Sequence, residues 1–347
     1  MRLHPAIIAF VGMIVCATTF LACCPCDYAT KDIEVGEGVD VRIKQDGKDG
    51  VEMGLKRPIR LNYLEFEAGT RYVKQQYDAD GNKQDLFGSG DASERLTYVK
   101  LSYTRQLIGG IDFLDSKFSL KGRTWIDYAS LSETIPYNIN MTMDRSGSGF
   151  RSTGLEASFG TRRLLQTRLG GRIFTGYQLN LEGDPDPSDP DKQQYSSRQN
   201  AFYIGTEWDY WCKKMRLEFD AYYDITTERE DNGFTYDLGD ILAISAGGSY
   251  GFKVSETITL APALNLNFLS KSETKSNGNS QANSDGYILS LTPAVNIRLA
   301  TSGLSFKVAY GYEEEFQRTP VGGIALSGKN LPVPGGFTGS IGAQYRF

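Results

Sequence analysis

Acidic residues occur in same-face pairs at several places along the chain. The pairs are Glu65 and Glu67, Glu207 and Asp209, Glu218 and Asp220, and Glu313 and Glu315. Residues two apart share one face of a β-strand, so each pair would point the same way. Two neighbouring carboxylates can act as the acid and the base of a hydrolysis. The alternative, which we favour, is that basic side chains on neighbouring strands neutralise them as structural ion pairs.

Histidine is almost absent. The single histidine is His4, in an N-terminal segment that we expect to be removed. Histidine is the usual general base at neutral pH, because its pKa lies close to the working pH. We therefore expect no catalytic residue and no enzymatic activity, and carboxylate-dependent catalysis is the least favoured alternative.

Long segments alternate between apolar and polar residues, which is typical of β-strands. In residues 258–268 every second side chain from Ile258 to Phe268 is apolar or proline, and those between are Ala, Thr or Asn. Residues 215–225 alternate between apolar and charged side chains. Hydrophobic residues make up only 40% of the chain. That fraction suffices when one strand face meets lipid and the other meets water.

The strands and connections predict an all-β fold, a transmembrane antiparallel β-barrel of about 12 strands over residues 59–347. Long connections (76–93, 132–149, 181–198, 228–239, 271–284 and 317–336) alternate with short turns, as in outer-membrane barrels. The expected strands are 61–75, 94–106, 117–131, 150–161, 164–180, 199–211, 214–227, 240–252, 256–270, 285–299, 303–316 and 337–347.

The polar face of each strand should line the lumen. The pore-lining candidates are Glu65, Glu67, Lys100, Lys121, Arg123, Trp125, Arg168, Arg172, Glu207, Asp209, Arg216, Glu218, Asp220, Tyr222, Arg298, Lys307 and Glu313. Opposite charges in such rows could set the selectivity of a pore. Trp125, Tyr203 and Tyr222 would either fill the lumen or form an apolar path for a solute. Other aromatic residues near strand ends, Tyr98 among them, predict interfacial girdles.

The N-terminus has the pattern of an export signal. Residues 1–22 combine Arg2 with an apolar run that ends in small residues, as in a signal peptide. A retained membrane helix is the less favoured alternative. The stretch 20–23 resembles a lipoprotein cleavage box, so Cys23 is a lipidation candidate; ordinary cleavage nearby is the alternative. Residues 23–58 would form a periplasmic arm or a plug in the lumen.

The remaining cysteines suggest a tether. Cys212 falls in an expected periplasmic turn, on the same side of the membrane as Cys24 and Cys26. The periplasm allows disulfides, so we expect Cys212 to pair with one of these two.

We expect no cofactor and no metal. The run at 78–82 resembles the opening of a calcium loop, but Lys83 and Ser89 replace its required Gly and Glu. The aspartates of 184–191 suggest a solvated loop, with weak divalent binding as the alternative. The net charge of -5 and the lack of a basic tract argue against a nucleic-acid partner.

The C-terminal segment resembles the last strand of bacterial outer-membrane barrels. Residues 337–347 alternate in hydrophobicity and end in Phe347, with Tyr345 two positions earlier. In that class the strand is the signal for the barrel-assembly machinery. The resemblance implies a bacterial outer-membrane location, with membrane lipid, lipopolysaccharide and the assembly machinery as partners.

The second half of the chain resembles the outer-membrane transporters associated with the phenol meta-cleavage pathway. The similarity lies in GGSYGFKVSETITLAPALNLNF, SDGYILSLTPAVNIRL, LSFKVAYGYEEEFQRTPVGG and GSIGAQYRF. It implies a channel or uptake barrel for passive passage of small, in part aromatic, solutes. A structural or adhesive surface barrel with a filled lumen is the alternative. Barrel enzymes such as the omptin protease resemble one another in using histidine, which the mature chain would lack.

Overall fold

The computed structural model describes one compact unit, which spans Arg60–Phe347. Within it the described residues are 62–77, 83–85, 92–138, 141–181, 200–212, 214–231, 234–237, 239–280, 286–299, 302–315 and 336–347. In these ranges no helix has both the length and the apolar character needed to span a bilayer. The predicted signal peptide, the arm and Cys23, Cys24 and Cys26 lie outside them.

Twelve antiparallel strands form a closed ring, which confirms the predicted fold class. They are β1 (Asn62–Val73), β4 (Ser93–Phe113), β5 (Ser116–Asn138), β6 (Met141–Thr161), β7 (Leu169–Asn180), β8 (Ala201–Cys212), β9 (Met215–Thr226), β12 (Ile241–Tyr250), β14 (Ile258–Lys271), β17 (Gly286–Leu299), β18 (Leu304–Glu315) and β19 (Gly336–Arg346).

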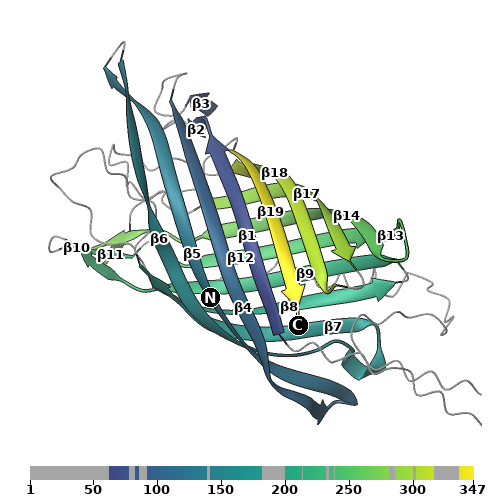
Figure 1. Ribbon diagram of the computed structural model, residues 1–347. Coiled ribbons are helices and arrows are strands. Elements are labelled where there is room, and N and C mark those ends of the chain that lie inside the picture. The colour runs from purple at the N-terminus through teal and green to yellow at the C-terminus, as the bar shows by residue number, and fades with distance from the viewer. Residues whose placement is uncertain are drawn as a thin grey trace, which may run out of the picture. The chain divides into compact units, whose positions relative to one another are not determined.

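Strand pairing continues around the whole ring. β12 pairs with both β9 and β14, and the first strand β1 pairs with the last strand β19 from Tyr63 opposite Arg346 to Tyr72 opposite Phe337. Figure 1 shows β1 and β19 side by side. Backbone hydrogen bonds of 3.1 Å in both directions between Asn62 and Phe347 extend this seam. The ring therefore leaves no unpaired edge, which is what a β-structure needs to cross a bilayer.

The outer face of the ring is apolar and exposed. On β6 the side chain of Leu155 is 69% exposed, whereas its neighbour Glu156 is only 8% exposed. Ile173, Ile204 and Ile341 on other strands are likewise more than half exposed. Apolar residues in such numbers would not remain in water around a whole molecule. They form the lipid-facing surface of a barrel located in the bacterial outer membrane.

The two ends of the ring differ. Short turns join β4 to β5, β6 to β7, β8 to β9, β12 to β14 and β17 to β18 at the end where the β1–β19 seam begins with Asn62 and Phe347. The link from β6 to β7 contains the 3-10 turn η2 (Leu164–Gln166), and β13 (Phe252–Lys253) precedes β14. Longer connections leave the opposite end, except that only residues 139–140 separate β5 from β6. In this class that end faces the outside.

Several short strands occur within the long connections. β2 (Gln75–Tyr77) pairs with β3 (Lys83–Asp85). A second small sheet contains β10 (Arg229–Asp231), β11 (Phe234–Asp237), β15 (Lys275–Ser276) and β16 (Asn279–Ser280).

The predicted boundaries need three corrections. The strand expected to end at residue 106 continues as β4 to Phe113, because β-bulges between Gln106 and Ile108 and between Gly109 and Ile111 interrupt the alternation without ending the pairing with β5. Residues 132–149 were expected to be a loop, but β5 and β6 continue as a paired hairpin through almost all of that range. Residues 132–149 are mostly Ser, Gly, Thr, Asn and charged residues, so they lack the apolar alternation that marks a strand. β7 begins at Leu169 rather than at residue 164, because η2 and a bend occupy the preceding residues.

Candidate functional site

Side chains from non-adjacent strands meet inside the ring. The rings of Trp125 on β5 and Tyr203 on β8 have centroids 6.0 Å apart, although β6 and β7 lie between those strands. Such contacts form only on the concave side of a curved sheet. Because side chains alternate, these contacts identify the lumen-facing half of each strand.

Glu65 on β1 is the centre of one cluster. Its carboxylate accepts hydrogen bonds from Arg123 on β5 at 3.1 Å, Ser102 on β4 at 2.9 Å and Gln344 on β19 at 2.6 Å. Arg123 also donates to Ser102 at 3.2 Å. Four strands that include the β1–β19 seam are therefore joined by charge-assisted hydrogen bonds.

Arg172 on β7 is the centre of a second cluster. It donates to Glu207 on β8 at 2.7 Å and to Glu156 on β6 at 2.6 Å. The phenol of Tyr203 also donates to Glu156, at 3.3 Å. The guanidinium of Arg172 thus binds both Glu156 and Glu207, so these two carboxylates do not form an isolated acid and base.

A third cluster lies between β1, β4, β5 and β6. The guanidinium of Arg151 donates to Asp127 and lies 6.0 Å from the ring centroid of Tyr98, whose hydroxyl donates to Glu67 at 2.9 Å. Tyr98 therefore points into the lumen, and its prediction as a girdle residue is wrong. A Cβ at residue 69 would lie 2.5 Å from this phenol, so Gly69 makes room for the ring.

Aromatic rings fill part of the lumen beside these clusters. Phe174 lies 6.1 Å from Tyr203, and Lys100 lies 5.2 Å above the ring of Trp125. A Cβ at residue 154 would lie 2.1 Å from Trp125, so this ring packs against the bare backbone of Gly154. Trp125 is only 6% exposed, which makes it a filling residue of the wall.

Strands β8 and β9 carry the other predicted acids. Arg216 lies 2.5 Å from Glu218 and 3.7 Å from Asp209. Asp220 is opposite Glu207 in the pairing of β8 with β9. Tyr222 shares the inward face with these acids. Lys121 on β5 lies 5.1 Å above the ring of Tyr63.

The opposite side of the lumen carries mainly small uncharged residues. We call the following ten inward residues the small-residue wall: Ser245, Gly247, Asn265, Asn267, Ser290, Thr292, Ala309, Gly311, Thr338 and Ser340. The amide of Asn267 donates to Ser290 at 3.0 Å and to Thr292 at 3.4 Å. Because these side chains are short, they project less into the lumen than the charged and aromatic side chains opposite.

The other four pore-lining candidates differ in their positions. Arg168 lies in the bend before β7 and not in a strand, which corrects its predicted place. Arg298 on β17 and Lys307 on β18 are exposed, on the inward face beside the small-residue wall. Glu313 occupies a strand position in β18 opposite Ser290, and its side chain lies outside the described residues.

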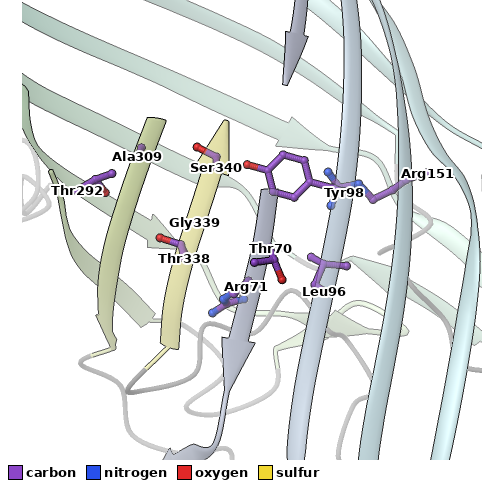
Figure 2. Close-up of a pocket in the computed structure, with 10 residues that line it drawn as sticks. All are labelled: Thr70, Arg71, Leu96, Tyr98, Arg151, Thr292, Ala309, Thr338, Gly339 and Ser340. Atoms are coloured by element: carbon purple, nitrogen blue, oxygen red, sulfur yellow. The ribbon is translucent and has the colours of Figure 1, made fainter. Parts of the chain in front are cut away.

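A cavity of about 260 Å³ lies in the long-loop half of the lumen. Its lining residues are Thr70, Arg71, Leu96, Tyr98, Arg151, Thr292, Ala309, Thr338, Gly339 and Ser340. Figure 2 shows them on strands from both sides of the seam, with the Tyr98 phenol pointing toward Ser340. The small-residue wall thus forms one side of the cavity, and the third cluster forms the other.

Sequence reasoning missed several residues of this network. Asp127, Arg151 and Glu156 hold central ion pairs but were not among the candidates. Two-residue spacing from Trp125 does identify Asp127, and spacing from Ser152 and Ser158 identifies Glu156. Arg151 gives no such signal, because a β-bulge between Asp127 and Tyr128 shifts its register.

The predicted metal loops lie outside the described residues, and so do two of the three cysteines of the predicted tether. The aspartates of 78–80 and 184–191 lie outside the described residues. Among the residues that are described, no group of three or more His, Cys, Asp or Glu side chains could hold a metal ion. Cys212 ends β8 at the short-turn end. Its pairing with Cys24 or Cys26 stays a prediction, as do lipidation of Cys23 and the assembly role of Tyr345 and Phe347.

Comparisons with known proteins place the fold. No protein-family model and no curated protein sequence matches the chain. Among solved structures, the COG4313 outer membrane channel from Pseudomonas putida F1 is similar with a TM-score of 0.59 and 12% identity, over 91% of this chain and 100% of that one. At this identity the similarity shows the fold alone.

Two further solved structures have lower TM-scores against this chain. The β domain of the Bordetella autotransporter BrkA has a TM-score of 0.45 and 10% identity, covering 83% of this chain and 100% of its own. A Pseudomonas aeruginosa FadL homologue has a TM-score of 0.38 and 13% identity, covering 83% and 91%. The chain has the fold of bacterial outer-membrane β-barrels.

Proposed function

We propose that this barrel is a passive channel through which small solutes, aromatic ones included, cross the outer membrane. The observation that carries the proposal is the asymmetry of the lumen. Its charged and aromatic residues are held against the wall made by β1 and β4–β9, whereas the small-residue wall opposite leaves space. A barrel of this size lies between small filled barrels and wide porins, so its passage should be narrow and selective.

Two further facts support transport over catalysis. Glu65, Glu156 and Glu207 each accept a hydrogen bond from an arginine, as expected of structural ion pairs. The similar structure from Pseudomonas putida is described as a channel, which is the activity that we infer here.

Planar-bilayer recording of the mature protein tests the proposal. We expect discrete, stable current steps. Ala309→Trp puts a bulky ring on the small-residue wall and should lower the conductance several-fold. Val308→Trp places the same ring on the lipid-facing side of the same strand and should leave the conductance unchanged.

The same recording addresses the alternative and the arm. A correctly folded barrel that carries no current and takes up no solute would contradict the channel and support a surface barrel with a filled lumen. If residues 27–58 act as a plug, their deletion should raise the conductance; an unchanged current would show that they are only an arm.

A further inference from the structure

A group of aromatic side chains lies on the outward face of the ring, near the end that the long connections leave. Tyr72 on β1 is opposite Phe337 on β19. The ring of Phe337 has centroid distances of 6.1 Å to Tyr310 and 5.2 Å to Tyr312, both on β18. Two-residue spacing from the exposed Leu64 places Tyr72 on the same lipid-facing side. Aromatic rings at this end form part of the interfacial girdle of the barrel.

Two cations flank the Tyr72 ring. The ammonium of Lys74 lies 5.8 Å from the ring centroid, and the guanidinium of Arg95 lies 5.6 Å from it. Arg95 is opposite Tyr72 in the pairing of β1 with β4, two strands that run side by side in Figure 1. Within the described part of the chain, neither cation forms an ion pair with a carboxylate. The adjacent Glu94 is opposite Val73, on the inward face.

The outward face changes from apolar to polar at the level of these cations. On β4 the exposed apolar side chains Leu101 and Val99 are followed, toward the long-loop end, by Thr97 and Arg95. On β5 the residue opposite Arg95 is the exposed Ser132. The two cations therefore lie where lipid tails give way to headgroups, on the side of the membrane that faces the outside.

A phosphorylated lipid fits this surface. Guanidinium and ammonium groups both bind phosphate oxygens, and basic residues at a membrane surface attract anionic headgroups. The face of the Tyr72 ring attracts both cations and so keeps their charged groups together above the girdle. The outer leaflet of a bacterial outer membrane contains lipopolysaccharide, whose phosphates lie directly above its acyl chains.

We propose that Lys74 and Arg95, beside the Tyr72 ring, bind a phosphate group of lipopolysaccharide on the outer surface of the barrel. The aromatic group of Tyr310, Tyr312 and Phe337 contacts acyl chains in the same leaflet. This inference goes beyond the proposed channel function and does not depend on it, because all of these side chains lie on the lipid-facing side of the ring.

Native mass spectrometry of the detergent-solubilised mature barrel measures the binding of lipopolysaccharide. The wild-type barrel should bind it at least about tenfold more tightly than the double variant Lys74→Gln with Arg95→Gln, because the variant lacks both cations that face the anionic headgroup. Lipopolysaccharide from which the phosphates have been removed should bind both proteins with the same, weaker affinity.

A second double variant is the matched control. Lys117→Gln with Lys253→Gln removes the same charge from exposed residues at the short-turn end, which faces the other leaflet. This variant should bind lipopolysaccharide as tightly as the wild type. Heat-modifiable migration shows that each variant is folded before its affinity is compared.

Several outcomes would overturn the proposal. They are equal affinities of the wild type and the Lys74/Arg95 variant, equal weakening in the control, and tight binding of the dephosphorylated lipid. Phosphatidylglycerol that binds as tightly, with the same dependence on the two cations, would overturn the choice of lipopolysaccharide. Planar-bilayer conductance should be the same for the wild type and the Lys74/Arg95 variant; a change would show that these side chains reach the lumen and would overturn their outward placement.

Discussion

Individual lumen residues act in clusters, and the members of the cluster around Arg172 are unequally buried. The side chain of Glu156 is only 5% exposed, and Arg172 is its ion-pair partner. Glu207, the second partner, is 41% exposed, so water screens that pair. Most of the stabilisation that depends on Arg172 should therefore come from the charge of Glu156.

Replacing Arg172 should consequently destabilise the barrel. Arg172→Met leaves the Glu156 carboxylate buried without its counter-charge, and we expect a loss of about 3 kcal/mol in the free energy of unfolding. Urea titration in lipid vesicles measures it. The double variant Arg172→Met with Glu156→Gln should recover much of the loss; equal destabilisation of both variants would contradict this account.

At the scale of elements, the turn between β4 and β5 departs from the preferred chemistry. Leu114 and Asp115 both have a φ of 49°, the left-handed region that most side chains avoid. The turn between β15 and β16 has similar geometry at Asn277 (φ 49°) and Gly278 (φ 76°), which is the favoured pair for a two-residue hairpin.

The β4–β5 turn should therefore be open to improvement. Changing Leu114-Asp115 to Asn-Gly should raise the free energy of unfolding by about 1 kcal/mol, because it removes the left-handed strain. Urea denaturation checks the change. The opposite exchange, Asn277-Gly278 to Leu-Asp, is the matched control and should be destabilising or neutral; a gain there would undermine the argument.

Alternation along β18 makes a second prediction at this scale. Val308 is 51% exposed on the outer face, whereas Lys307 faces the lumen. Val308→Lys puts an ammonium group into lipid and should cost about 2–4 kcal/mol near the bilayer centre. Lys307→Gln, one residue away, should change stability by less than about 0.5 kcal/mol. Similar effects at both residues would mean that the two faces are assigned wrongly.

At the scale of the whole molecule, the last residue, Phe347, makes separate contacts through its backbone and its side chain. The backbone of Phe347 bonds Asn62, while its side chain is 47% exposed and stacks on Tyr345 with centroids 5.6 Å apart. Backbone closure and side-chain recognition can therefore be separated by changing the side chain alone.

Phe347→Ala should leave the folded barrel nearly intact but impair its assembly in cells. We expect normal refolding into vesicles, because the Asn62 hydrogen bonds use the backbone, and a reduced yield of heat-modifiable barrel in outer membranes. Phe337→Ala removes an exposed aromatic residue at the other end of β19 and serves as the control. Equal yields for both variants would remove Phe347 from the assembly signal.

The sequence by itself determined the strands and the two faces of the ring. Residues 258–268 show apolar and small polar side chains in turn, and this local period places each side chain in lipid or lumen before any partner strand is known. It also identified Glu65, Arg123 and Arg172 as lumen residues. The alternation failed at 132–149, where β5 and β6 pair although their residues form no regular apolar side.

Only the tertiary structure decided which lumen residues meet. The hydrogen bonds from Arg172 to both Glu156 and Glu207, and the approach of Trp125 to Tyr203, depend on strand register and on the curvature of the ring. The cavity also depends on closure, because its lining comes from strands at the two ends of the chain. Register, bulges and closure are set by long-range pairing, which a local sequence period does not encode.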